Sequence, residues 1–187
     1  AFQALPPDDA GARWRAWARL RALLPDTASE DVQPDRYLTS FVIAHAGAFT
    51  LEPFVGADGF DIDPVLIGPK PSSNGMALEG ADVETVPEPA PLLPRDLHET
   101  FIQRRFRTAD RARSHYTLKD GYHLVLDPDV QAALDVVRQV QRGPREARRA
   151  FARNPRAALQ EALGGRLDDA AIERLFVETA RYSERVR

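Results

Sequence analysis

Arginines are concentrated in one part of the chain, where only Glu146 interrupts them as an acidic residue. A forked guanidinium can donate two hydrogen bonds to one phosphate, and neutralised phosphates supply most of non-specific nucleic-acid affinity. We therefore identify five of these arginines as candidate phosphate contacts that hold the backbone without reading base sequence. The full cluster comprises Arg138, Arg142, Arg145, Arg148, Arg149, Arg153 and Arg156. The five candidate nucleic-acid-binding residues are Arg142, Arg145, Arg148, Arg149 and Arg153.

The same arginines could also have no nucleic-acid partner. They could form a solvated helical face, or a face that docks onto the acidic N-terminal half of the chain. Phe151 is the one aromatic residue within the cluster, whereas a platform for single strands needs several rings on which bases stack. The pattern therefore indicates phosphate contact rather than base recognition.

Three aspartates offer a second type of chemistry. Asp58, Asp61 and Asp63 could present carboxylates to a hard cation, but the calcium-loop spacing with its closing glutamate is absent. Asp63 and Lys70 give only the outline of a nuclease motif, and prolines interrupt it. Turn formation around Gly59 is the favoured interpretation, and a divalent-metal enzyme is the less favoured one.

Histidines and glycines add no further site. No two of the four histidines have the i, i+4 spacing of a helical zinc site, and the chain has no cysteine. The histidines are His45, His98, His115 and His123. Glycines do not form a phosphate-binding loop that opens a helix. We expect no catalytic residue, no metal and no cofactor in this chain.

Charge is distributed unevenly between the two halves. Residues 1–94 carry 6 basic and 14 acidic side chains, a net charge of −8, whereas residues 95–187 carry 19 basic and 14 acidic, a net charge of +5. Such asymmetry can mark a nucleic-acid surface, or two halves that attract one another. Both interpretations stay open.

Composition places the chain among globular proteins, with 43% hydrophobic and 28% charged residues. No apolar run is long enough to cross a bilayer, and the first residues lack the pattern of a signal peptide. These features predict a cytoplasmic protein with no membrane partner. The chain begins without methionine and ends in a helical pattern, so we interpret it as a piece of a larger protein.

The N-terminal part has mixed structural signals. A helix is expected from Asp8 or Asp9 to about residue 24, with Trp14 and Trp17 on its inner face. Residues 37–44 and 49–54 are expected to form a β-hairpin or two neighbouring strands, and residues 61–67 a third strand whose Pro64 suits a sheet edge. Residues 69–94 are rich in proline and glycine, which predicts a linker or long loop.

The C-terminal part is expected to be mainly helical. A helix over residues 95–108 precedes a β-hairpin whose turn is Asp120-Gly121, and His115 and His123 could then face each other across it. Helices should follow from Asp127-Pro128 to Gly143, from Pro144 to Arg153, from Asn154 to Gly164, and from Asp168 through Phe176. The predicted class is α+β, with an α+β portion over 1–68, a linker over 69–94, and a helix, β-hairpin and helical bundle over 95–187.

Four short strings in the last third carry a resemblance to a known family. They are residues 151–159 (FARNPRAAL), 162–164 (ALG), 175–179 (LFVET) and 182–186 (YSERV). They resemble a region upstream of the ATPase core in large bacterial SNF2-type helicase-like proteins. The resemblance implies a non-catalytic accessory domain beside a DNA-dependent ATPase. None of that ATPase's phosphate-binding or acidic motifs occurs here.

The resulting hypothesis is an accessory module that contacts DNA through a basic helical face or positions a partner domain of the parent protein. Its main alternative is a protein-interaction or autoregulatory domain without nucleic-acid contact, in which the acidic and basic halves engage each other or a neighbour. A divalent-metal enzyme using Asp58, Asp61 and Asp63 is the third hypothesis.

Overall fold

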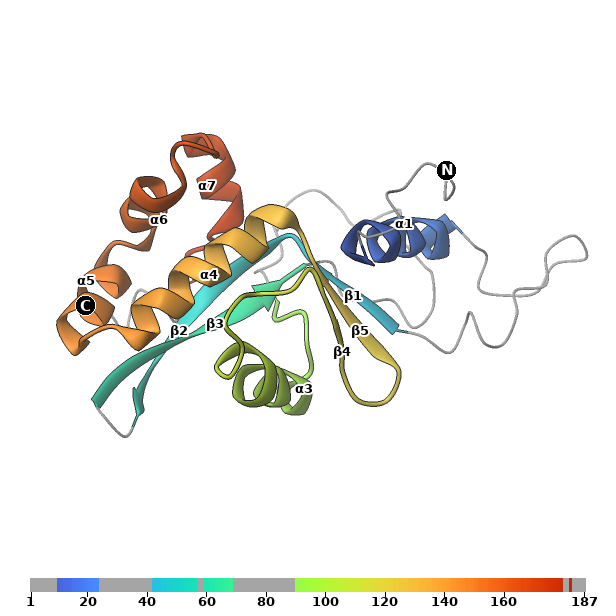
Figure 1. Cartoon of the computed structure of the whole chain (residues 1–187), viewed down its shortest axis with the longest axis horizontal. Coiled ribbons are helices and arrows are strands. Elements are labelled where there is room, and N and C mark those ends of the chain that lie inside the picture. Colours follow the sequence, from blue (N-terminus) through green and yellow to red (C-terminus); the bar gives the residue numbers. More distant parts are fainter. Residues whose placement is uncertain (1–9, 24–41, 57–58, 69–89, 180–181, 183–187) are drawn as a thin grey trace, which may run out of the picture.

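The structure is a computed structural model of mixed α+β class that describes residues 10–23, 42–56, 59–68, 90–179 and 182. Among these residues the helices concentrate toward the C-terminus, and the strands form two small sheets (Figure 1). The elements are α1 (Ala10–Leu23), β1 (Val42–Ala46), β2 (Ala48–Gly56), β3 (Gly59–Ile67), α3 (Arg95–Phe101), the π-helical turn η2 (Ile102–Phe106), β4 (His115–Thr117), β5 (Tyr122–Leu126), α4 (Pro128–Arg142), α5 (Arg145–Arg153), α6 (Pro155–Leu163) and α7 (Asp169–Leu175).

The first sheet joins strands that are distant in sequence. Its order is β1-β5-β4, with β1 parallel to β5 and β4 antiparallel to β5. Strands β2 and β3 form a separate antiparallel pair, so the expected pairing of residues 37–44 with 49–54 is wrong. The chain passes from β1 to β2 at Gly47 and thereby changes sheet, and residues 37–41 lie outside the described part.

The two hairpins match local signals in the sequence. Asp120 and Gly121 have φ of 55° and 74°, so both central residues of the β4–β5 turn adopt the left-handed conformation that a tight two-residue turn requires. Pro64 lies opposite Leu51 in the β2–β3 pair, and β3 has no further strand among the described residues. The strand predicted over 61–67 is therefore confirmed as an edge strand.

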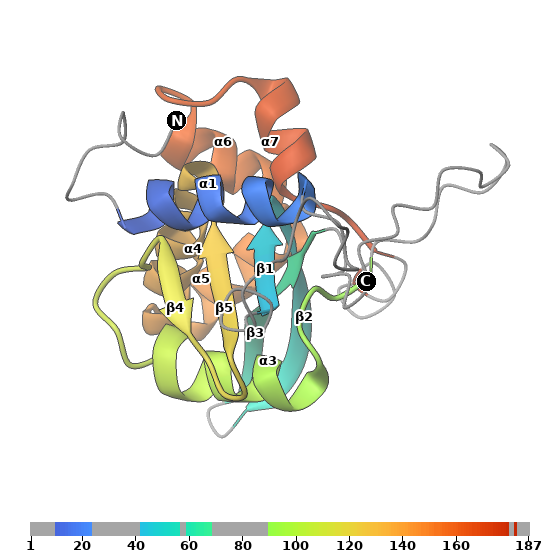
Figure 2. The same cartoon turned by 90° about the vertical axis from the view of Figure 1, so that its right-hand side faces the viewer.

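Helix α1 crosses one face of the three-stranded sheet and contacts all three of its strands (Figure 2). Trp14 lies on its inner side and stacks on two imidazoles of the hairpin beneath, with ring centroids 4.5 Å from His115 and 4.1 Å from His123. Both of those side chains come from β4–β5. The assignment of Trp14 to the inner face of the first helix is confirmed.

The C-terminal helices begin at the residues that the sequence marks. The Asn154 side chain accepts a hydrogen bond from the Ala157 amide at 3.3 Å, and the Asp168 side chain accepts one from the Ala171 amide at 2.7 Å. Phe176, by contrast, leaves helix α7 and bridges β2 at Phe49. The prediction that Phe176 belongs to the last helix is wrong, because β2 offers its edge to the chain there.

One hydrophobic core contains residues from both sides of the proline-rich stretch, among them Phe49, Leu51, Leu97, Leu124 and Leu134. Leu92 is buried and donates its amide to the Leu66 carbonyl at 2.8 Å, while Pro91 bridges Ile67. The described end of that stretch therefore packs against β3. Its other residues, 69–89, lie outside the described part.

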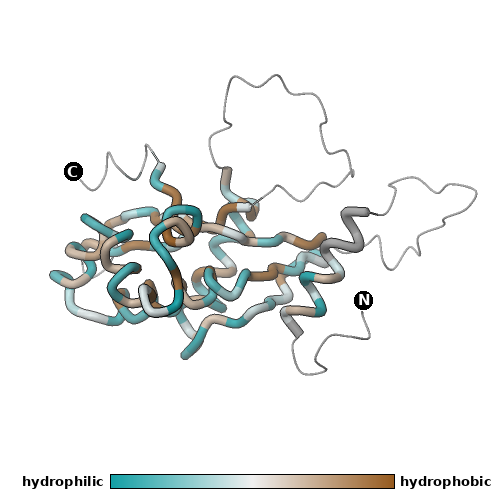
Figure 3. The backbone as a smooth tube through the Cα atoms, turned by 90° about the horizontal axis from the view of Figure 1, so that it is seen from above, coloured by the Kyte–Doolittle hydropathy of each residue, from teal (hydrophilic) through white to brown (hydrophobic). Residues whose placement is uncertain are grey.

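Hydrophobic and hydrophilic residues alternate along the helices rather than forming uniformly apolar segments (Figure 3). This alternation fits helices with one face on a shared core and the other in water. Among the described helices none combines the length and the apolar character needed to span a membrane.

Candidate phosphate-contacting surface

The five candidate arginines lie on α4 and α5, but the structure divides them by what their guanidinium groups contact. Arg142 donates from Nη2 to the Ala109 carbonyl at 3.0 Å and lies 3.8 Å from the Asp110 carboxylate. Arg148 donates from Nη1 to the Gln141 carbonyl at 3.1 Å. These two side chains stabilise the junction between α4, α5 and the segment before β4, which leaves them less available to a ligand.

Arg145, Arg149 and Arg153 are exposed on α5, and no ion pair or hydrogen bond engages their side chains within the described part of the chain. Phe151 and Ala152 are the buried residues of this helix, and the Arg145 guanidinium packs against Gly59 of β3. Because α5 is anchored by apolar contacts, its outward arginines need no protein partner to hold the helix in place. Residues four apart lie on one helical face, so these three follow one another along the surface.

Arg138 is a different case, although it belongs to the same sequence cluster. Its side chain is 3% exposed and donates from Nε to the Phe106 carbonyl at 3.0 Å and from Nη1 to Asp135 Oδ1 at 2.9 Å. The guanidinium also lies 4.8 Å from the centroid of the Phe106 ring. Arg138 is thus part of the core and contributes nothing to a surface for phosphates.

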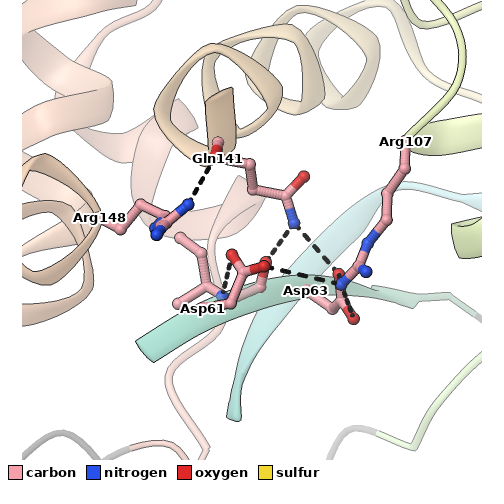
Figure 4. A network of polar contacts seen from close by, with 6 residues as sticks. Asp61, Asp63, Arg107, Gln141 and Arg148 are labelled. Carbon is pink, nitrogen blue, oxygen red and sulfur yellow. Dashed lines mark hydrogen bonds and ion pairs between the residues drawn. The ribbon is translucent and has the colours of Figure 1, made fainter. Parts of the chain in front are cut away.

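The acidic residues form an internal ion-pair network (Figure 4). Nη2 of Arg107 donates to both carboxylate oxygens of Asp63, at 2.8 and 3.0 Å, and lies 3.9 Å from Asp61 Oδ2. Gln141 donates from Nε2 to Asp63 Oδ1 at 3.1 Å and also to the Ile62 carbonyl. The network connects β3 to α4 and to the segment after η2.

Burial raises the pKa of Asp63, and the hydrogen bond and positive charge of Arg107 partly oppose that rise. Arg107 therefore supplies the counter-charge that a cation would otherwise bring to Asp63 and Asp61. Within the described ranges no group of three His, Asp or Glu side chains is arranged to hold a metal ion, and Asp58 lies outside those ranges. The geometry accordingly favours a structural role for Asp61 and Asp63.

His115 and His123 face each other across the β4–β5 hairpin, as the sequence predicted, with Nε2 of His115 3.0 Å from Nδ1 of His123. Burial, and then the neighbouring His123, lower the pKa of His115 to about 4. Burial also lowers the pKa of His123. The two rings are therefore neutral near pH 7 and act as packing groups under Trp14.

A cavity of about 540 Å³ lies between the β2–β3 pair and α3. Its lining includes the carboxylates of Glu52, Asp63 and Glu99, together with His98, whose pKa is lowered by burial. Arg95 also lines the cavity but pairs with Glu99, and Arg107 pairs with Asp63, so this cavity does not extend the basic surface of α5.

A second group of five arginines, which the sequence-based prediction of a binding surface did not include, lies between η2 and β4 within residues 104–113. Their density in the sequence is a visible signal, but the apolar period of the same stretch predicts only its buried side. The five arginines are Arg104, Arg105, Arg107, Arg111 and Arg113. Arg107 is committed to Asp63, whereas Arg104, Arg105 and Arg113 are exposed around a second cavity.

Comparisons of the chain with protein-family models, with curated proteins and with solved structures found no match.

Proposed function

We propose that this chain is a non-catalytic accessory module of a larger bacterial protein and contacts DNA phosphates through α5. The observation that carries the proposal is the row of three exposed arginines, Arg145, Arg149 and Arg153, whose side chains make no ion pair or hydrogen bond among the described residues. The resemblance of the last third to a region beside a DNA-dependent ATPase supports the same type of partner. Such a module would act in the cytoplasm.

The proposed mechanism is electrostatic. Each guanidinium can donate a pair of hydrogen bonds to one phosphate, and successive arginines on one helical face can meet successive phosphates. Binding of this kind releases counterions and is therefore weakened steeply by salt. No base-stacking aromatic accompanies the row, because Phe151 is buried, so affinity should depend little on base sequence.

The test is fluorescence anisotropy with labelled single- and double-stranded DNA at several salt concentrations. The triple variant Arg145→Gln, Arg149→Gln and Arg153→Gln should bind more weakly. Loss of three phosphate contacts should reduce the slope of log K against log salt by about 2–3. A matched control, Arg95→Gln, Arg166→Gln and Arg174→Gln, removes the same charge from exposed positions elsewhere and should lose much less. Equal loss in both triple variants would refute a contact at α5.

The second candidate function is a protein-interaction or autoregulatory domain, and one observation favours it. The ion pair of Arg107 with Asp63 joins the basic half of the chain to the acidic half. Part of the charge asymmetry is therefore satisfied inside the fold rather than by an external polyanion. If the chain failed to bind DNA even at low salt, this second function would take precedence, and a binding partner would be sought among other domains of the parent.

A further inference from the structure

A cavity of about 490 Å³ lies between η2 and β4, which is the edge strand of its sheet among the described residues. It is within the size range of small-ligand sites in proteins. Its polar lining is basic and hydroxylic, and no carboxylate of the described residues contributes to it. The polar side chains that line it include those of Arg104, Arg105, Arg113, His115, Tyr116 and Thr117.

The π-helical turn directs two of these arginines outward. Ile102 and Phe106 are buried and fix the turn on the core, and the Arg107 amide donates to the Ile102 carbonyl at 3.0 Å across the wider turn. Arg104 and Arg105, which lie between the two anchors, are exposed. Turns of this type recur at functional sites, where the extra residue changes the direction of side chains.

The third arginine comes from a segment that side-chain hydrogen bonds hold in place. The Ala112 amide donates to Asp135 Oδ1 at 2.6 Å, and Gln131 donates to the Ala112 carbonyl at 2.8 Å. The Arg113 amide donates to the Tyr116 hydroxyl at 2.7 Å. The backbone of Arg113 is thus fixed while its side chain stays exposed, so a ligand has to order the side chain but not the backbone.

Charge decides the kind of ligand. The guanidinium groups of Arg104, Arg105 and Arg113 have no carboxylate partner within the described residues, so their positive charge is not neutralised locally. His115 contributes a neutral ring at the wall, because its pKa is lowered to about 4. An anion with several acceptor oxygens suits three such donors, and the Thr117 hydroxyl can add a further hydrogen bond. The Thr108 hydroxyl already donates to the Arg104 carbonyl at 2.9 Å.

We propose that this cavity binds the phosphate of a nucleotide, either a free nucleotide or the terminal phosphate of a nucleic-acid strand. A phosphate alone would fill a small part of the volume, whereas a nucleotide would occupy much more of it. The site is separate from the arginines of α5. It can therefore be present or absent independently of the phosphate contact proposed for that helix.

The experiment is isothermal titration calorimetry of the whole chain at low salt with inorganic phosphate, with AMP, and with a short single strand carrying either a 5′-phosphate or a 5′-hydroxyl. Arg104→Gln with Arg105→Gln, and separately Arg113→Gln, should each weaken phosphate and AMP binding at least about tenfold. Arg166→Gln with Arg174→Gln removes the same charge from exposed positions outside both arginine surfaces, so it is the matched control and should leave these affinities unchanged. Far-ultraviolet circular dichroism should show that every variant is folded.

Two results would overturn the site: no binding of phosphate or AMP by the unmodified chain, or equal binding by the cavity variants and the control with Arg166→Gln and Arg174→Gln. A 5′-phosphorylated strand that binds more tightly than the 5′-hydroxyl strand, with the difference lost in the cavity variants, would assign the cavity to a strand end. AMP binding without such a difference would assign it to a free nucleotide. Strand binding that is lost in the α5 triple variant but kept in the cavity variants, without any binding of phosphate or AMP, would refute this site while supporting the proposed function.

Discussion

Nε2 of His115 lies 3.0 Å from Nδ1 of His123, and the indole of Trp14 stacks on both rings. A hydrogen bond between two imidazole nitrogens needs one nitrogen with a proton and one with a free lone pair. Double protonation would remove that lone pair and place two positive charges under the aromatic ring. The contact between α1 and the β4–β5 hairpin therefore depends on neutral histidines.

Acid should weaken the fold through this contact. The pKa of His115 falls from 6.5 to about 4 on folding, so the folded state resists a proton that the unfolded chain accepts. Stability from this source is complete above pH 6.5 and is lost as the pH falls toward 4. Because the ring is partly exposed, we expect a loss of about 1–2 kcal/mol rather than the full value of the pKa difference.

Urea unfolding of the unmodified chain and of His115→Gln between pH 7.5 and 4 measures this effect. The difference between the two chains should shrink as the pH falls, because glutamine does not titrate. Asp63 acts in the opposite direction, since its raised pKa makes the folded state gain stability on acidification, and comparison of the two chains cancels it. A difference that stays constant across this pH range would contradict the prediction.

Local signals predicted those features of the fold that depend on residues near one another in sequence. Asp120-Gly121 specified the turn that brings His115 and His123 diagonally across from each other on the hairpin, and Asn154 and Asp168 marked two helix starts. Each of these is decided by backbone conformation or by a hydrogen bond to a residue three positions away. The hairpin and the caps were therefore accessible without any knowledge of tertiary contacts.

The sequence did not predict which strands and segments pair when they are far apart along the chain. Strand β1 pairs with β5, whose residues lie about eighty positions away, and no turn signal encodes such a parallel contact. Phe176 has the spacing of a helical core residue, yet the edge of β2 draws it out of the helix. In both cases packing across the molecule selects the outcome over local propensity.

The candidate site was also only partly predictable. Clustering in sequence singled out the arginines of α4 and α5, but whether each guanidinium meets solvent or a carbonyl depends on tertiary contacts. Arg138 follows Val130, Leu134 and Val137 on the buried face of α4, so the helical periodicity alone predicts that its side chain is buried. No comparable signal distinguished Arg142 and Arg148 from Arg149 and Arg153.

Removal of the Arg107 side chain should destabilise the fold, since Asp63 would remain buried with a charge and no counter-charge. We expect Arg107→Leu to lower the free energy of unfolding by about 1–3 kcal/mol at pH 7. The loss should diminish in acid, because protonation of Asp63 removes the need for a partner. Chemical denaturation at pH 7 and pH 4 measures both values.

Two further variants separate the pair from a general packing effect. Arg107→Leu combined with Asp63→Asn should recover part of the stability, since the uncompensated charge is gone. Arg95→Leu removes an arginine whose ion pair with Glu99 is largely exposed, and it should leave stability almost unchanged. Equal losses for Arg107→Leu and Arg95→Leu would show that the network in Figure 4 contributes no more than a surface pair.

Substitution of Arg138 should lower the stability of the fold, and substitution of Arg149 should lower DNA affinity, although both residues lie in the same arginine-rich stretch. Arg138→Leu leaves the Phe106 carbonyl and part of the Asp135 carboxylate without their donor, and we expect a loss of about 2–4 kcal/mol in unfolding free energy. Arg149→Leu changes an exposed position and should alter that free energy by less than about 0.5 kcal/mol.

DNA affinity should follow the opposite order, because Arg149 faces solvent while the Arg138 guanidinium is enclosed by Phe106 and Asp135. Thermal unfolding provides the stability measurement, and DNA anisotropy below the unfolding transition of the less stable variant provides the affinity measurement. An Arg138→Leu chain that keeps its stability but loses DNA binding would reverse the assignment, and would mean that Arg138 leaves the core to reach a phosphate.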